Sequence, residues 1–320
     1  MRKCAVELSD ARQRPTSMKT IYELLRQTMT EWSEDKVPRL GAALAFYSVF
    51  AIAPLLLIVI AIAGFVFGRD AAQRQIVGQI AGVVGQESGQ AIDKILEQAS
   101  QPASGTFAIV SGVVVLLFGA SGVFAQLQDS LNTIWEVAPK PGRGWKGVLR
   151  DRFLSLSMVL GIGFLLLVSL VVSAGLSAMT GLLGDSVSEL IGHVINVVVS
   201  LAVITVLFAM IYKFLPDVKI AWRDVWLGAA ATSALFVVGK LLVGLYLGRS
   251  SAASAYGAAS SFVLILLWVY YSSQILLFGA EFTQVYANRF GSRIEPARGA
   301  VPLTAEAQAQ QGAPSTTMRA

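Results

Sequence analysis

The sequence has little charge and very few side chains of the kinds that carry catalysis or bind metals. Charged residues make up 14% of the chain, against about 25% in ordinary soluble domains. The single cysteine, Cys4, excludes an intrachain disulfide, and the single histidine, His193, has no second ligand at the spacing of a metal site. No phosphate-binding glycine loop, Ser-His-Asp set or paired-carboxylate cleft can be assembled. We therefore predict no catalytic residue, no metal site, no cofactor and no enzyme activity.

Hydrophobic sequence, in contrast, is abundant: it makes up 55% of the chain and gathers in six long runs. A helix needs about 20 residues to cross a hydrocarbon core about 30 Å thick. The runs cover residues 42–67, 106–124, 153–176, 194–214, 225–247 and 258–282. Surface helices of a soluble protein keep a polar face, which these runs lack. The sequence predicts an all-α, polytopic membrane protein with six transmembrane helices.

The lysines and arginines predict the orientation of these helices. Twenty of them lie in the N-terminal region, the second and fourth connections and the C-terminal tail, and four lie in the alternate connections. Loops that stay in the cytoplasm carry the excess of Lys and Arg. Both termini are therefore predicted to be cytoplasmic, as an even number of spans requires. The same asymmetry accounts for most of the net charge of +5, so no nucleic-acid partner is predicted.

The chain divides into three parts: a cytosolic N-terminal region at 1–40, a six-helix transmembrane domain at 41–290 and a cytosolic tail at 291–320. The composition of the tail is typical of disorder. In the N-terminal region, Ile21, Leu25 and Trp32 recur at helical spacing, which predicts an amphipathic helix at about 17–33. That helix lies on the inner membrane face or packs against the cytosolic loops.

The longest connection, residues 68–104, follows the first span. The spacing of Ile76, Ile80 and Ile92 predicts one or two short amphipathic helices in it, with a break near 85–89. These helices either cap the outer mouth of the bundle or rest on lipid.

Small residues and one proline mark places where helices bend or approach closely. Pro54 removes a backbone hydrogen bond from the first span, which predicts a kink. Gly119 and Gly122 belong to a run of four small residues in the second span. Gly244 and Gly248 follow each other at four-residue spacing in the fifth span. Such positions let neighbouring helices pack closely or let a helix bend.

Lys240 is the most unusual residue within the spans, because a charge inside the bilayer costs at least about 2.5–3.5 kcal/mol. It lies past the midpoint of the fifth span, toward the outer side. The Cα–Cβ bonds of a helix tilt toward its N-terminus, which favours a Lys240 side chain that faces the bundle in a functional or structural role. The alternative is a lysine that snorkels to the outer headgroups.

Polar side chains also follow one face of the sixth span, at Tyr270, Tyr271, Gln274 and Glu281. On a membrane helix such a stripe faces protein or a water-filled cavity. Glu281 lies within a turn of the inner interface, so ordinary interfacial solvation is the alternative for this residue.

A second polar group is expected near the cytosolic face: Arg39, Gln126, Asp129, Asn132 and Asp217, together with Glu281. These residues form either a polar vestibule or the polar helix ends that any such bundle has. With Lys240 and the stripe of the sixth span, they are the candidates for a polar pathway or for helix packing.

Several short motifs together resemble the YihY/virulence factor BrkB family. They are residues 38–48 (PRLGAALAFYS), 53–55 (APL), 119–135 (GASGVFAQLQDSLNTIW), 212–217 (YKFLPD), 228–229 (GA), 256–258 (YGA), 267–271 (LWVYY) and 279–281 (GAE). The resemblance covers about residues 20–290. It implies a six-span protein of the bacterial inner membrane whose biochemical activity is not firmly known.

Three functions follow as hypotheses. Links of relatives to envelope lipid handling favour a transporter-like protein that handles a lipid or small solute in envelope maintenance, with membrane lipids as partners. The second hypothesis is a non-transporting scaffold or homeostasis factor, in which the polar residues hold helices together. The third is a tRNA-processing ribonuclease, after the older family label "ribonuclease BN", although the sequence offers no acid, base or metal set to cleave RNA. The oligomeric state is not predicted.

Overall fold

Long apolar helices dominate the computed structural model, which describes residues 18–84, 86–99, 122–140, 187–249, 260–292 and 294–304. The main helices are α3 (Val37–Phe67), α8 (Val187–Phe214), α9 (Trp222–Arg249) and α11 (Ser260–Phe290). The predicted third span, most of the predicted second span and Gly119 lie outside the described residues.

Three segments of the described chain are long and apolar enough to cross a membrane: Val197–Phe214, Trp222–Leu242 and Phe262–Phe290. A fourth is added if Met18–Glu34 and Val37–Ala53, which meet at an angle of 64°, are counted as one broken span. The prediction of a helical membrane protein is thus confirmed, whereas the total of six spans remains a prediction.

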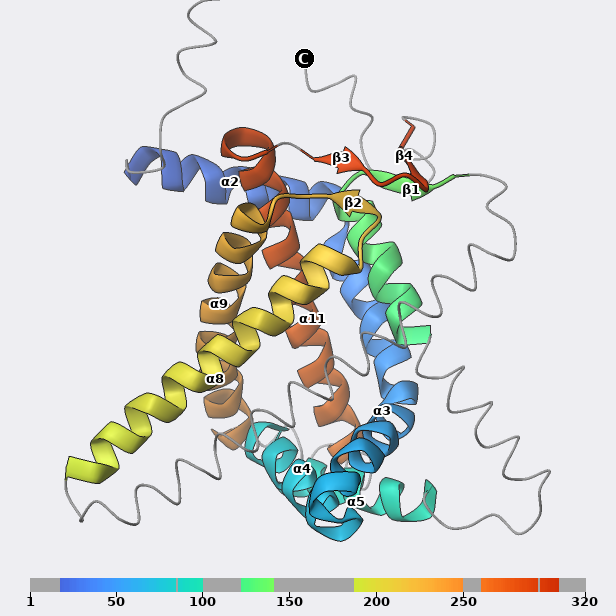
Figure 1. Ribbon diagram of the computed structural model, residues 1–320, viewed down its shortest axis with the longest axis vertical. Coiled ribbons are helices and arrows are strands. Elements are labelled where there is room, and N and C mark those ends of the chain that lie inside the picture. Colours follow the sequence, from blue (N-terminus) through green and yellow to red (C-terminus); the bar gives the residue numbers. More distant parts are fainter. Residues whose placement is uncertain are drawn as a thin grey trace, which may run out of the picture.

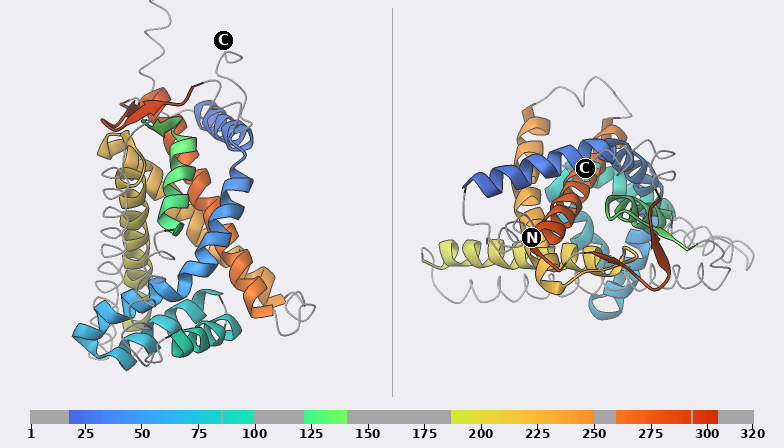
Figure 2. Two further views of the ribbon diagram at one scale, coloured as in Figure 1. Left: turned by 90° about the vertical axis from the view of Figure 1, so that its right-hand side faces the viewer. Right: turned by 90° about the horizontal axis from the view of Figure 1, so that it is seen from above.

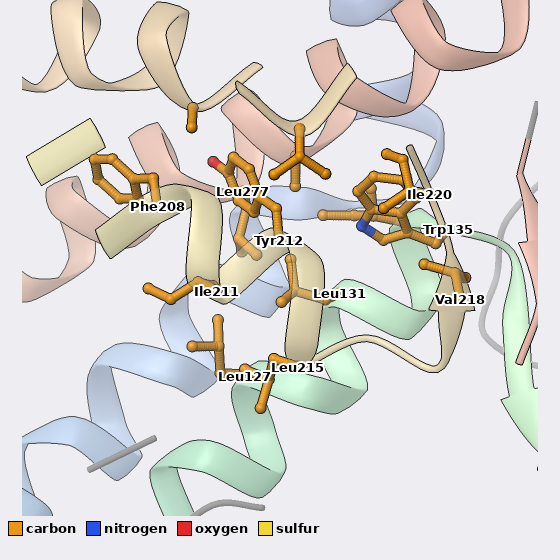
Figure 3. Close-up of a cluster of buried hydrophobic side chains, with 14 of the residues drawn as sticks. Leu127, Leu131, Trp135, Phe208, Ile211, Tyr212, Leu215, Val218, Ile220 and Leu277 are labelled. Carbon is orange, nitrogen blue, oxygen red and sulfur yellow. The ribbon is translucent and has the colours of Figure 1, made fainter. Parts of the chain in front are cut away.

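Helix α11 lies at the centre of the bundle, with α3 on one side and α9 on the other, and α8 packs against α9 (Figures 1 and 2). Helical residues 122–134 complete the core at one end. There, Leu131, Tyr212 and Leu277 are fully buried against one another's helices (Figure 3). Large apolar side chains such as Phe50 and Leu241 face outward, as on a surface solvated by lipid.

One end of the bundle, here called the α2 end, carries helix α2 (Met18–Glu34) and both described ends of the chain (Figure 1). Helix α2 occupies the range for which the sequence predicts an amphipathic helix, and Lys36, with a left-handed φ of 52°, makes the corner into α3. Pro38 stands in the first turn of α3, where its missing N–H does no harm. Pro54 lies inside α3, which continues to Phe67.

The C-terminal segment corrects the expectation of a tail disordered from residue 291. Strand β3 (Glu295–Pro296) pairs antiparallel with β2 (Val218–Lys219), and β4 (Ala300–Pro302) pairs antiparallel with β1 (Val137–Pro139). The two ribbons lie at the α2 end (Figure 1). Strands of two or three residues are too short to show a periodic pattern, so only their backbone pairing with distant segments reveals them.

The opposite end, here called the α4–α5 end, is covered by α4 (Arg69–Val84) and α5 (Gln86–Ala99). Ile92 and Leu96 of α5 are buried with Ile60 of α3 and Ile265 of α11. The sequence predicts one or two short helices here with a break near 85–89; the structure has two, one ending at Val84 and the next beginning at Gln86, and they pack on this end of the bundle.

Candidate functional site

Glu281 is the most unusual side chain of the described bundle. It lies on α11, one residue after Ala280, and none of its surface is exposed. Its two carboxylate oxygens receive no hydrogen bond from a backbone amide or a basic side chain of the described residues, and the side chain that hydrogen-bonds with Glu281 is another acid, Asp35. An ionised carboxylate in such a position loses the solvation of water and gains no bond from an amide or a basic side chain in return.

The surroundings of Glu281 add further negative charge. The acidic side chains of Asp35, Glu31 and Glu136 interact electrostatically with it, and Asp35 does so most strongly. Asp35 and Glu31 belong to the end of α2 and the corner after it, and Glu136 follows helical residues 122–134. Glu281 therefore lies where three separate parts of the chain bring carboxyl groups together. Even so, no group of three or more His, Cys, Asp or Glu side chains in the described ranges has the arrangement to hold a metal ion.

Gln274 lies two turns before Glu281 and faces the start of α3. Its Nε2 donates a hydrogen bond of 3.5 Å to the Pro38 carbonyl, while its Oε1 is buried without a partner in the described structure. Gly41 makes this contact sterically feasible: a Cβ there would overlap the Gln274 amide. Gln274 and Glu281 are thus two incompletely satisfied polar groups on α11.

The tyrosines of the predicted stripe do not all share this face. Tyr271 packs against α9, where a Cβ on Gly239 would lie 2.5 Å from its hydroxyl. Tyr270 and Tyr271 are both half-buried. The stripe that the sequence places on one helix face is therefore divided between the contacts of α11 with α3 and with α9.

Asn132 has a different role from the one expected of a vestibule. Its Oδ1 accepts a 2.8 Å hydrogen bond from the Asp217 backbone N–H, and its Nδ2 donates to Asp217 Oδ2 at 3.3 Å. Gln128 Nε2 donates to the same carboxylate at 3.5 Å. Both Asn132 and Asp217 are buried. Asn132 therefore ties helical residues 122–134 to the loop after α8.

The other predicted vestibule residues are scattered. Gln126 bonds Ser130 of its own helix, and Arg39 and Asp129 are exposed. Although the Asp129 side chain reaches the surface, the protein around its carboxyl desolvates that group and raises its pKa above the ordinary value. These three residues do not join Glu281 in a common site.

Lys240 is exposed on α9 among the outward-facing apolar side chains of Val238, Leu241 and Leu242. The separation of Lys240 and Glu281 along the membrane normal that the sequence predicts keeps the two side chains from pairing. Of the predicted packing glycines, Gly122 makes an ordinary contact, with its Cβ position 3.6 Å from Tyr47. Gly244 and Gly248 are helical residues of α9.

Sequence reasoning missed the close contacts that align α9 with α11. A Cβ on Gly228 would overlap Thr283, and a Cβ on Gly279 would overlap Thr232. Tyr212, from α8, is fully buried there; its hydroxyl donates to the Leu276 carbonyl at 2.7 Å and lies 3.1 Å from the Thr232 hydroxyl. The four-residue spacing of Gly279 and Thr283, and of Gly228 and Thr232, was the available signal.

An apolar groove lies between α2, α9 and α11, with a cavity volume of about 380 Å³. Ile21 and Leu25 of α2, Ala231 and Leu235 of α9, and Phe282 and Tyr286 of α11 line it. Helix α2 is joined to α11 at the rim by an ion pair between Glu23 Oε2 and Arg289 Nη2, 2.6 Å apart. The amphipathic face of α2 thus forms one wall of a hollow in the bundle surface.

Residues 28–304, which include every part of this site from Glu31 to the β ribbons, match the family described as virulence factor BrkB. The chain belongs to the virulence factor BrkB family. This confirms the resemblance in the sequence motifs. No solved structure matches the chain.

The BrkB match is accompanied by curated bacterial relatives. The chain is 27% identical to UPF0761 membrane protein RSc1559 of Ralstonia nicotianae over 80% of its own length and 57% of the relative's. It is 28% identical to UPF0761 membrane protein PA0951 of Pseudomonas aeruginosa over 77% and 58%, and 29% identical to a UPF0761 membrane protein of Azotobacter vinelandii over 77% and 59%. The chain thus spans less than two thirds of the length of these BrkB-like relatives. Their names identify membrane proteins and no activity.

Proposed function

We propose that this BrkB-family chain is a transporter-like protein of the bacterial inner membrane that handles a lipid or small solute in envelope maintenance. The observation that carries the proposal is Glu281, a fully buried carboxyl whose neighbours in the described structure are other carboxyl groups, above all that of Asp35, and which receives no hydrogen bond from an amide or a basic side chain. Ionisable groups inside membrane proteins are costly, and they mark substrate pathways and proton relays. The proposal includes six spans, cytoplasmic termini, no enzyme activity and no nucleic-acid partner.

The topology has two independent supports. The two described chain ends lie at the same end of the bundle (Figures 1 and 2), as an even number of crossings requires. That end also carries the regions with most of the Lys and Arg residues, which favours the cytoplasm there. The bacterial membrane-protein relatives support the bacterial membrane.

The contrast between satisfied and unsatisfied polar groups supports a working role for Glu281. Asp217 and Tyr212 are buried as well, and each has hydrogen bonds that fully explain its place. In the described chain Gln274 Oε1 has none, and the side chain that hydrogen-bonds with Glu281 is another acid, Asp35. A buried polar group that contributes no stabilising hydrogen bond to the fold is more readily explained by ligand binding or proton transfer during function.

A reconstitution experiment tests the proposal. Purified protein is placed in phosphatidylethanolamine and phosphatidylglycerol vesicles with a trace of fluorescent phospholipid, and a membrane-impermeant reductant measures movement between leaflets. We expect wild-type protein to accelerate movement and Glu281→Gln to lower the rate about tenfold or more, the loss of about 1.4 kcal/mol of barrier stabilisation. Glu295→Gln, at an exposed strand position, is the matched control.

Two results would refute the proposal. One is wild-type protein that moves neither the lipid probe nor any solute of a metabolite panel. The other is folded Glu281→Gln protein that moves substrate at the wild-type rate. An RNA-processing activity would require purified protein, free of nuclease contamination, to release nucleotides.

A scaffold is the second candidate, and the satisfied networks favour it. Tyr212 joins α8, α9 and α11, and Asn132 joins the 122–134 helix to the loop after α8. Polar contacts of this kind hold membrane helices together without any transport. In a scaffold, Lys240→Met would change the abundance or assembly of the protein and leave every flux at zero.

A further inference from the structure

The groove between α2, α9 and α11 has the dimensions and chemistry of a site for an extended hydrocarbon chain. Its volume of about 380 Å³ falls near the lower end of ligand pockets, which span about 300–1,000 Å³. An α-helix with its side chains is about 10 Å wide, too thick for this hollow. A single extended hydrocarbon chain is narrow enough to enter it.

The groove lies at the depth of a lipid leaflet. Its α9 wall, Leu227 to Leu235, belongs to the first turns of a membrane-crossing segment, and its α11 wall belongs to another. Trp222 and Trp226 are exposed in the same first turns of α9, on the side of Phe214 of α8, and exposed tryptophans gather at the membrane interface. Helix α2 crosses this end of the bundle (Figure 1) with Ile21 and Leu25 on the groove.

The part of α2 that forms a wall of the groove carries more positive than negative charge. On α2 between residues 18 and 30 the charged side chains are Lys19, Glu23 and Arg26. Glu23 is paired with Arg289 of α11. Lys19 and Arg26 are exposed and remain as the surplus cations on this part of α2. An anionic headgroup is the complement of that surplus.

We propose that the groove binds one acyl chain of an anionic phospholipid from the leaflet at the α2 end, with its headgroup beside Lys19 and Arg26. The apolar walls bind the acyl chain, and the two cations favour a negatively charged headgroup. This site does not depend on transport, because a resident lipid can also fasten α2 to the bundle.

Photo-crosslinking tests this site in the full-length protein. The probe is phosphatidylglycerol with a diazirine on one acyl chain, at trace level in phosphatidylcholine nanodiscs, and crosslinked peptides are mapped by mass spectrometry. We expect the crosslinks to concentrate on α2, α9 and α11. Ala231→Phe fills the groove, and we expect about tenfold fewer crosslinks, as for the loss of a few buried methylenes. Ala230→Phe, next in sequence but exposed and outside the groove lining, should leave them unchanged.

The headgroup is tested by charge removal. Lys19→Gln with Arg26→Gln should abolish the preference for phosphatidylglycerol over a phosphatidylcholine probe. The control pair Lys140→Gln and Lys219→Gln, exposed on the β ribbons, should keep it.

Equal crosslinking of Ala231→Phe and Ala230→Phe, or crosslinks spread equally over α3 and α8, would identify ordinary surrounding lipid and overturn the proposal. If Ala231→Phe does not fold, competition by unlabelled phosphatidylglycerol in wild-type protein decides between a saturable site and bulk lipid. A Glu281→Gln variant that has lost transport and kept these crosslinks would separate this site from the proposed function.

Discussion

Two buried acids at the α2 end have opposite environments. Asp217 receives a hydrogen bond on its carboxylate from Asn132, and its backbone N–H donates to the same side chain. Glu281 is buried more completely (0% exposed, against 9% for Asp217), and in the described structure its carboxylate receives no bond from an amide or a basic side chain and has other carboxyl groups around it, Asp35 foremost. The first arrangement stabilises the fold. The second costs stability, so its presence is better explained by function than by structure.

The largest expected loss of stability comes from disturbing Asp217, the buried acid that is hydrogen-bonded. Asn132→Ala removes two hydrogen bonds of Asp217, the one that its backbone N–H donates and one that its carboxylate accepts, and we expect a loss of about 3 kcal/mol of stability. Thermal unfolding of the detergent-solubilised protein measures it. Gln126→Ala, which removes only a bond within one helix, is the control. Equal melting temperatures for the two variants would show that Asn132 does not stabilise the fold.

The second largest loss of stability is expected at the close contact between α9 and α11. Gly228→Ala places a Cβ in the space of the Thr283 side chain, whose hydroxyl is held by the Gly279 carbonyl. We expect about 2 kcal/mol of destabilisation from overpacking. Gly78→Ala on α4 has open space around its Cβ and should stabilise slightly through helix propensity. A Gly228→Ala protein as stable as Gly78→Ala would show that α9 and α11 do not approach this closely.

A smaller loss is expected at the three-helix junction. Tyr212→Phe removes the hydroxyl that donates to the Leu276 carbonyl, at a cost of about 1 kcal/mol. Tyr22→Phe, at an exposed position of α2, is the matched control. If both variants melt together, the Tyr212 bond contributes nothing and the contrast with Glu281 is weaker.

The smallest effect on stability is expected at Glu281 itself. Glu281→Gln keeps the shape of the side chain and removes its charge, so stability should stay equal or rise by about 1 kcal/mol or less. The same variant is expected to lose transport. A strong loss of stability would instead show that Glu281 has a structural role, and the proposed difference between Glu281 and Asp217 would no longer hold.

The polar candidate residues show which features of the site helical periodicity can predict and which it cannot. Glu281 and Gln274 were recognised as aligned on one helix, because two turns of an α-helix bring residues seven apart onto the same face. The sequence also predicts Asn132 and Asp217 in one polar group near the cytosolic face, but not the bond between them. The two residues are 85 positions apart, a separation that no helical period encodes.

By itself, the sequence determined the class of the protein: a helical membrane protein of the BrkB family, with an amphipathic helix before the first long helix. Hydrophobic length and periodicity are local properties, and lipid leaves the backbone of such runs no alternative to the helix. Tertiary structure alone decided which buried acid is satisfied, which glycines meet a neighbouring helix, and that residues 295–302 pair with distant loops. Those outcomes depend on contacts between segments far apart in the chain, and the free energy of each contact exists only once the helices are packed.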